Sequence, residues 1–190
     1  GYDAVEEILR ENKVDILLMQ ETYGTKDEWK ERMGYKTVNT DHNFVIFSRF
    51  PIEVLSQNDN SVGVKVELSP GRKVVLYDVW YDHRYYLPEY ACYWKEDIPT
   101  LISNEEYYRL DNQKSVLNDA RDYIDNSEDI PVIWGGDHNS PSHLDYIAAN
   151  AANNCKYVID NIPHSLQMIE VEGFTDSYRA IYPDPITHPA

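Results

Sequence analysis

The sequence predicts an α/β sandwich with mixed β-sheets, and two patterns carry this prediction. Four strand-like segments follow one another between residues 44 and 79 without an intervening helix, whereas helices and strands alternate on either side of them. Neighbouring strands of this kind form hairpins or a meander, and the flanking segments add further strands and covering helices. The combination fits neither an all-parallel Rossmann fold nor an all-β barrel.

The N-terminal part predicts two helices with a strand between them. Residues 3–12 repeat apolar side chains along one helical face. Four consecutive apolar residues, Ile16–Met19, then predict a strand that is buried on both faces. Glu21 is expected at the carboxyl end of this strand, and a short helix is expected over Lys26–Met33.

The middle of the chain predicts strands separated by turn sequences. In the segment 62–68, Val and Leu alternate with Gly63, Lys65 and Glu67, which is typical of a half-buried antiparallel strand. The four strands are expected over Phe44–Phe47, Ile52–Leu55, Val62–Leu68 and Lys73–Val79.

The second half of the chain begins with an aromatic loop over residues 81–100, and loops of that length tend to carry function. A helix is expected over 104–126, because Leu110, Leu117, Ala120 and Ile124 fall on one face. A short buried strand follows at Pro131–Trp134. Further helical segments are expected at Ser140–Ala152 and Ser165–Glu172, and Asp176–Arg179 is expected to begin a short turn or helix.

Composition limits the classes of partner. The chain has 33 acidic and 17 basic residues, a formal net charge of −16. Such a field repels duplex DNA, RNA and anionic membranes, so a small or lipid-linked substrate is favoured over duplex DNA. No apolar run reaches the roughly 20 residues of a transmembrane helix. We expect a soluble monomer, either exported or cytoplasmic, and Cys92 and Cys155 are compatible with a disulfide or with two free thiols.

Two acidic residues stand at the ends of separate buried strands. Glu21 follows Ile16–Met19, and Asp137 follows Pro131–Trp134. Ligands of open α/β sheets bind beyond the carboxyl ends of the strands, and two carboxylates delivered there can share a hard cation. Either residue alone is also ordinary for a solvated strand end or a turn.

Four motifs in order resemble the endonuclease/exonuclease/phosphatase superfamily. They are the strand ending in Gln-Glu at 15–21, the Ser-Arg-x-Pro-Ile turn at 48–52, the Gly-Asp-x-Asn segment within 131–141 and the Gly-x-x-Asp-x-x-Arg segment at 173–179. The resemblance covers nearly the whole chain. It implies a four-layer, DNase I-like α/β sandwich of two packed mixed sheets flanked by helices.

The resemblance also implies hydrolysis of phosphoester bonds with Mg²⁺ or Mn²⁺. Glu21 would ligate the metal, Asp137 would orient or deprotonate the attacking water, and Asn139 would donate a hydrogen bond to the phosphate. Asp176 and Arg179 are expected to form a structural pair.

The chain departs from the family pattern in several places. We expect residues 1–190 to be a single domain that lacks the family's first strand and its C-terminal Asp-His segment. Trp80 stands where many members carry a His, and an indole cannot replace a phosphate-binding imidazole. His83 is then a candidate for that role, or it is an ordinary surface-loop histidine. His138 replaces the usual Phe and is expected to fill a packing position.

Two alternative hypotheses follow from these departures. The domain could be a degenerate, non-catalytic member of the fold that binds a ligand or partner through the aromatic loop Trp80–Trp94. Alternatively, residues 1–190 by themselves are an inactive fragment, which leaves the function of the parent protein unchanged.

Overall fold

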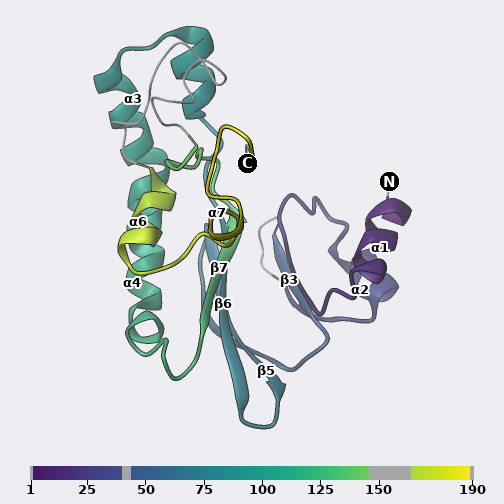
Figure 1. Ribbon diagram of the computed structural model, residues 1–190. Coiled ribbons are helices and arrows are strands. Elements are labelled where there is room, and N and C mark those ends of the chain that lie inside the picture. Colours follow the sequence, from purple (N-terminus) through teal and green to yellow (C-terminus); the bar gives the residue numbers. More distant parts are fainter. Residues whose placement is uncertain (1, 40–43, 146–163, 189–190) are drawn as a thin grey trace. The chain divides into compact units, whose positions relative to one another are not determined.

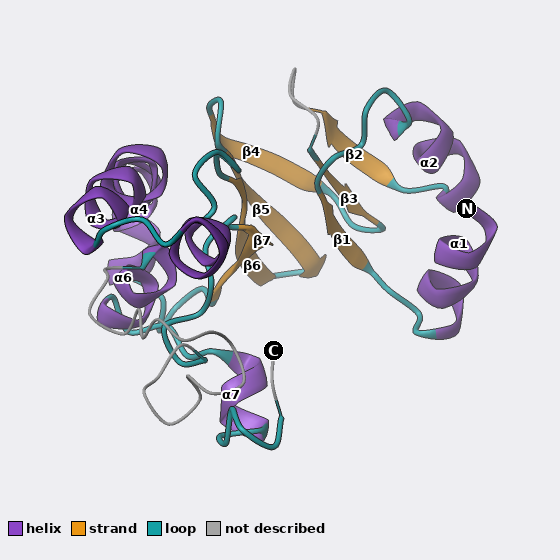
Figure 2. Cartoon of the chain, turned by 90° about the horizontal axis from the view of Figure 1, so that it is seen from above, coloured by secondary structure: helices purple, strands orange, loops and turns teal. Residues whose placement is uncertain are grey.

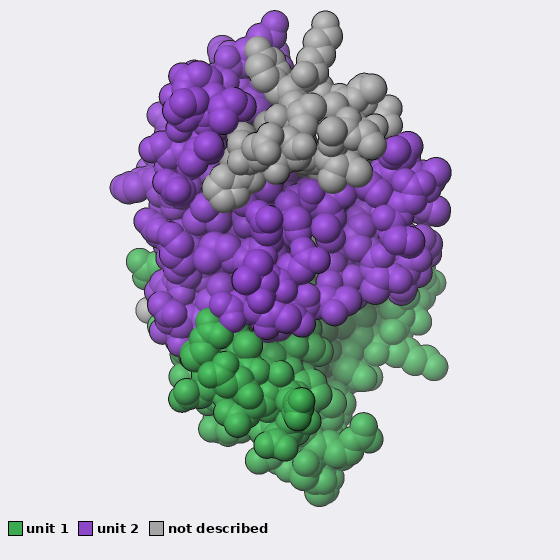
Figure 3. Space-filling model, turned by 60° about the vertical axis from the view of Figure 1, so that its left-hand side comes forward, with its two compact units in different colours: residues 1–80, 120–137 green, residues 81–119, 138–190 purple. Residues whose placement is uncertain are grey.

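The computed structural model describes residues 2–39, 44–145 and 164–188 of the 190-residue chain (Figure 1). The chain divides into two compact units, coloured separately in Figure 3. Unit 1 comprises residues 1–80 and 120–137, and unit 2 comprises residues 81–119 and 138–190. Within the described ranges, no helix is long and apolar enough to cross a membrane.

Unit 1 contains a three-stranded antiparallel sheet, called sheet A, with strand order β1-β3-β2. Its strands and helices are α1 (Tyr2–Glu11), β1 (Ile16–Met19), α2 (Lys26–Met33), β2 (Lys36–Asn39) and β3 (Val45–Ser48). The predicted helices and the predicted strand before Glu21 are present. Strand β2 was not predicted, because its four residues have no apolar alternation.

A second sheet of unit 1, called sheet B, is mixed and has strand order β4-β5-β6-β7. Its strands are β4 (Ile52–Gln57), β5 (Ser61–Ser69), β6 (Arg72–Trp80) and β7 (Val132–Asp137). The first three form the predicted antiparallel meander, whereas β7 runs parallel to β6. The register of this parallel pair places Asp137 beside Trp80.

The two sheets pack face to face. One buried cluster joins Phe44 and Ile46 of the sheet A side to Val64 and Leu76 of sheet B, and these side chains are almost fully removed from solvent. Burying each side chain of this size contributes about 1.5–3 kcal/mol. Figure 2 shows the two facing sheets, with α1 and α2 on the outer side of β1–β3. A separate cluster, which includes Leu9 and Trp29, attaches these helices to sheet A.

Unit 2 is largely helical. It contains η1 (Glu89–Trp94), α3 (Ile98–Glu105), η2 (Glu106–Leu110), the first nine residues of α4 (Asp111–Asp125), α6 (Ser165–Val171) and α7 (Ser177–Ile181). The helix predicted over 104–126 therefore begins earlier, and a π-helical stretch, η2, interrupts it. Its four predicted core side chains are buried, as expected. The predicted aromatic loop contains a second π-helical stretch, η1.

The helix predicted from Ser140 is wrong for the residues that the structure describes, and the rest of it lies outside them. Asn139 has a left-handed backbone with φ of 46°, and residues 142–145 form a turn in which the Asp145 N–H donates to the Ser142 carbonyl. The Ser140 hydroxyl, which was expected to cap the helix, donates instead to Glu105. A long-range contact has thus replaced the local cap.

Cys92, in η1, is disulfide-bonded. Of the two alternatives that the sequence left open, the described residues support the disulfide, since they include no free cysteine. Cys155 lies outside the described residues.

Candidate functional site

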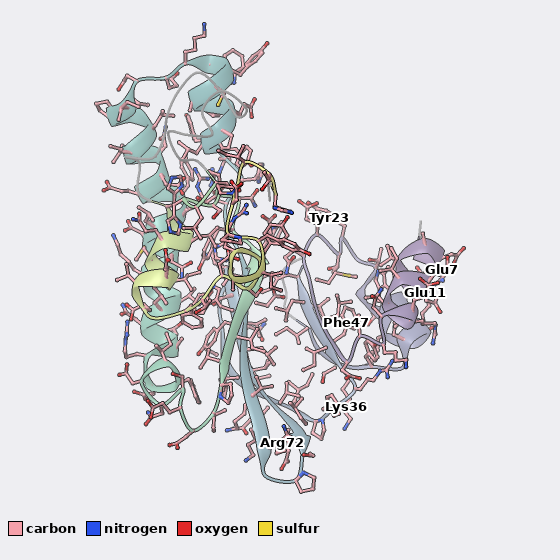
Figure 4. The ribbon with its side chains drawn as sticks, viewed as in Figure 1. Glu7, Glu11, Tyr23, Lys36, Phe47 and Arg72 are labelled. Carbon is pink, nitrogen blue, oxygen red and sulfur yellow. The ribbon has the colours of Figure 1, made fainter. Side chains whose placement is uncertain are left out.

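Glu21 lies just beyond the carboxyl end of β1, in an exposed turn. Its φ of 56° is left-handed, a conformation that is uncommon for a residue with a side chain and tends to occur at functional sites. Desolvation and the neighbouring Glu21 carboxylate raise the pKa of the Tyr23 phenol above its ordinary value. Figure 4 shows Tyr23 and Arg72 at opposite ends of unit 1.

A buried carboxyl group connects the two sheets at this end of unit 1. The Gln20 side-chain amide donates to Asp78 Oδ1 over 2.5 Å, although the two residues are 58 positions apart. Asp78 is fully buried, and its second oxygen, Oδ2, has no hydrogen-bond partner among the residues that the structure describes. Burial raises the pKa of Asp78 to about 8, and the hydrogen bond from Gln20 lowers it by a smaller amount. Asp78 is therefore largely protonated at neutral pH.

Asp137 ends β7 at the same end of unit 1. The register pairs Asp78 with Gly135 and Trp80 with Asp137. Asp137 therefore lies two residues further along β7 than the residue that pairs with Asp78, the acceptor of the Gln20 hydrogen bond. Gly136, which precedes Asp137, has φ of 131°, and a Cβ there would lie 2.1 Å from the Val79 carbonyl oxygen. Only glycine permits this close approach, and the approach sets the position of the Asp137 backbone.

The structure thus brings Glu21 and Asp137 to one end of the two-sheet sandwich of unit 1. Each follows a strand of a different sheet. The Gln20–Asp78 hydrogen bond joins the end of β1 to β6, and β6 pairs with β7.

Asn139 and His83 both belong to unit 2. The Asn139 side-chain amide donates to the Tyr81 carbonyl over 2.9 Å, which fixes the orientation of the amide group. His83 is exposed in the segment that follows Tyr81. The chain joins Asn139 to Asp137 through a single intervening residue, His138.

His138 fills a packing position, as predicted. Its ring is buried and meets the Tyr81 ring edge-on, with 5.4 Å between centroids, and its Nδ1 lies 3.4 Å from the Ser165 hydroxyl oxygen. Burial lowers the pKa of His138 to about 4, so the imidazole is neutral at pH 7.

Trp80 belongs to the hydrophobic core and not to a solvated loop. It is half-buried, packs against the cluster between the two sheets and meets Phe44 edge-on, with 6.3 Å between ring centroids. The position that many family members give to a histidine is therefore used for packing in this chain.

Asp176 and Arg179 have structural roles, but not as a side-chain pair. Asp176 caps α7 by accepting a hydrogen bond from the Arg179 backbone N–H over 2.9 Å. The buried Arg179 guanidinium pairs instead with the Asp145 carboxylate and donates to the Tyr182 and His188 carbonyls.

Sequence reasoning did not single out three polar side chains at the core of unit 2: Glu105, Arg109 and Gln113. All three have no exposed surface. Their signal in the sequence is the four-residue spacing, which puts Glu105, Arg109 and Gln113 on one helical face. A charged residue is almost never fully buried without a partner.

The motifs, the strand-end carboxylates and the two facing sheets agree with a comparison against known families. The model of the Endonuclease/Exonuclease/phosphatase family matches residues 1–180. The chain belongs to this family. Endonuclease/Exonuclease/phosphatase proteins are mostly phosphoester hydrolases, nucleases and phosphatases among them, and they generally depend on a divalent metal. The mixed α/β architecture is consistent with their DNase I-like fold.

One curated relative is an uncharacterized protein, F14F9.5, of Caenorhabditis elegans. It is 27% identical to this chain over 187 residues, an alignment that covers 92% of this chain. The chain spans 59% of the length of that relative. No solved structure matches the chain.

Proposed function

We propose that this Endonuclease/Exonuclease/phosphatase domain hydrolyses phosphoester bonds with the help of Mg²⁺ or Mn²⁺. The observation that carries the proposal is the hydrogen bond from Gln20, just after β1, to Asp78 of β6. Glu21 follows Gln20 directly, and Asp137 ends β7, the strand that pairs with β6. The family match over residues 1–180 supports the reaction class.

The donor set is compatible with a magnesium-type ion. Among the described residues, no group of three or more His, Cys, Asp or Glu side chains has the spacing to hold a metal. Mg²⁺ usually needs only one or two protein carboxylates, since waters and substrate phosphate oxygens complete its octahedron. Glu21 and Asp137 supply hard oxygen donors of this kind, and Glu21 is the residue that would hold the ion. A bound ion would polarise a phosphoryl oxygen and stabilise the leaving group.

The remaining roles follow from the chemistry of each side chain. Asp137 orients the attacking water and accepts its proton. The Asn139 amide, held by the Tyr81 carbonyl, donates a hydrogen bond to the phosphate as negative charge develops there. His83, exposed in the segment after Tyr81, supplies the phosphate contact that Trp80 cannot make.

The substrate class follows from charge. With a formal net charge of −16, the chain as a whole repels a long polyanion, whereas one phosphate group at a metal site is tolerated. We infer a small or lipid-linked phosphoester, and not duplex DNA, as the substrate of a monomeric protein.

Hydrolysis of bis-p-nitrophenyl phosphate and of p-nitrophenyl phosphate tests the proposal. The full-length protein is assayed with Mg²⁺, with Mn²⁺ and with EDTA, beside Glu21→Gln and Asp137→Asn. Asp129→Asn, which removes the same charge from an exposed position, is the matched control. Turnover should require the metal, and Asp137→Asn should lower it by about 10²–10⁴-fold. Wild-type rates in both site variants would contradict the assignment.

A second candidate function is binding without catalysis. Trp80 is a core residue, and the aromatic segment that follows it exposes Tyr93 and Trp94, which are 74% and 58% accessible. A folded protein that hydrolyses neither ester with any metal, yet retains a ligand through this segment, would favour this alternative. Tryptophan fluorescence of Trp94→Ala during ligand titration would locate the binding.

A further inference from the structure

A single buried guanidinium holds the segment that carries His83. The Nη1 atom of Arg109 donates to the Asp82 and Arg84 carbonyls, each over 2.9 Å, and Nη2 donates to the Tyr85 carbonyl over 2.8 Å. His83 lies between two of these three carbonyl groups. Because Arg109 has no exposed surface, water cannot replace these hydrogen bonds without opening the core of unit 2.

Glu105 connects the same guanidinium to the segment that carries Asn139. Its Oε2 accepts from Arg109 Nε over 2.5 Å, and its Oε1 accepts from the Ser140 hydroxyl over 2.6 Å. Ser140 directly follows Asn139 in the chain. Desolvation raises the pKa of Glu105, while Arg109 and Ser140 act in the opposite direction.

Gln113 holds Tyr81, the residue that precedes the segment carrying His83. The Tyr81 hydroxyl donates to Gln113 Oε1 over 2.9 Å, and the Tyr81 carbonyl accepts from the Asn139 amide. The Tyr81 ring also packs edge-on against His138. Tyr81 is therefore in contact with both segments.

These three side chains recur every four residues along one continuous helical stretch, which runs from the end of α3 through the π-helical η2 into α4. Residues four apart lie on the same helical face, and π-helical turns frequently occur at functional sites. The stretch that elsewhere buries Leu110 and Leu117 carries two charges and an amide at these positions. A leucine would pack in their place, so their polarity indicates a task other than burial alone.

We propose that Glu105 and Arg109 are positioning residues, which hold the segments 82–85 and 139–140 so that His83 and Asn139 keep a fixed geometry. This inference rests on the proposed function of His83 and Asn139. A planar fork that bonds three carbonyls at once defines the path of the backbone, whereas a lysine ammonium in the same place cannot span them. Displacement of a substrate contact by about 1 Å costs on the order of 10² in rate.

Arg109→Lys and Ser140→Ala test the proposal in the full-length protein. Arg179→Lys is the matched control, because Arg179 is also buried in unit 2, also pairs with a carboxylate and also donates to two carbonyls, but holds a different segment. Steady-state hydrolysis of bis-p-nitrophenyl phosphate with Mg²⁺ gives kcat and KM. Hydrogen–deuterium exchange of residues 81–86 reports the order of the segment without reference to activity.

Arg109→Lys should lower kcat by about 10–100-fold with KM changed less than about threefold, and exchange in 81–86 should accelerate. Ser140→Ala should lower kcat by about 3–10-fold, which is the effect of one lost hydrogen bond. Arg179→Lys should leave both readouts within about twofold of the wild type. Equal losses of kcat in Arg109→Lys and Arg179→Lys, or unchanged exchange in 81–86, would overturn the positioning role.

The two proposals fail in different ways. A wild-type protein without metal-dependent turnover overturns the proposed function, and with it any catalytic meaning of the positioning. An active wild type whose Arg109→Lys variant keeps its kcat overturns the positioning role alone. Misfolding of Arg109→Lys does not obscure the result, because Ser140→Ala leaves the buried charge pair intact and must show the smaller loss.

Discussion

Replacement of Asp78 by Asn should stabilise the protein in a pH-dependent way. The Asp78 carboxyl is fully buried, and within the described part of the chain one of its oxygens has no hydrogen-bond partner. Burial raises its pKa from 3.8 to about 8. Asn keeps the carbonyl oxygen that accepts from Gln20 but cannot ionise, so the substitution isolates the cost of burying this titratable group.

The sign follows from proton binding. Between pH 3.8 and pH 8 the carboxyl is protonated in the folded protein and ionised in the unfolded chain, so the free energy of unfolding falls as pH rises and levels off above pH 8. Each pKa unit corresponds to about 1.4 kcal/mol, so wild type should lose about 3 kcal/mol relative to Asp78→Asn between pH 5 and pH 7.

Urea denaturation, followed by tryptophan fluorescence in EDTA, measures this difference at pH 5, 6 and 7. The comparison of wild type with Asp78→Asn cancels the titration of all other groups. Asp129→Asn, at an exposed position, controls for the loss of one negative charge from an acidic chain. A difference between wild type and Asp78→Asn that stays within about 0.5 kcal/mol from pH 5 to pH 7 would refute the reasoning, since linkage demands a slope.

Three further outcomes are expected. Gly136→Ala should lower the free energy of unfolding by more than about 3 kcal/mol, because its Cβ would overlap the Val79 carbonyl. Gly71→Ala, whose Cβ meets open space, should cost only its backbone strain of about 1–2 kcal/mol. Thermal denaturation of the two variants compares these losses. His138→Phe should gain stability relative to the wild type as pH falls. Burial lowers the pKa of His138 to about 4, so the wild type loses folding stability between pH 6.5 and pH 4, whereas Phe does not titrate. Urea midpoints of both proteins at pH 5 and pH 7.5 check this. Thiol titration of the unreduced, denatured protein should find no free Cys92, and Cys92→Ser should destabilise it by about 2–4 kcal/mol; one free thiol per cysteine would contradict the disulfide.

Local pattern was a good guide to the sheets. The apolar run before Glu21 and the alternation in 62–68 became β1 and β5, because strands carry these periods. The predicted burial of β1 on both faces is wrong, since all four of its residues are half-buried. Strand β2 was missed, since its four residues carry neither pattern. The helix expected from Ser140 failed in its described part because Glu105 takes the hydroxyl that would have capped it.

The two acids at the strand ends were also predictable, because a carboxylate after an apolar strand stands at the sheet's edge. The strand before Asp137 is not buried as predicted, since Ile133 is 51% exposed. The roles of the residues near these acids were not predictable. Trp80 could have faced solvent or the core, and only the packing against Phe44 placed it in the core. Hydrolysis by the Glu21→Gln variant tests the proposed ligand role of Glu21.

The sequence by itself determined the main strands other than β2, the acids that follow β1 and end β7, and the family to which the chain belongs. These properties depend on neighbouring residues and on periodicity. Tertiary structure alone decided that Gln20 meets Asp78 across 58 residues and that Arg109 reaches carbonyls 24–27 residues away. A buried polar group takes whichever partner the fold brings to it, and the cost of leaving it unpaired, rather than any local preference, selects that partner.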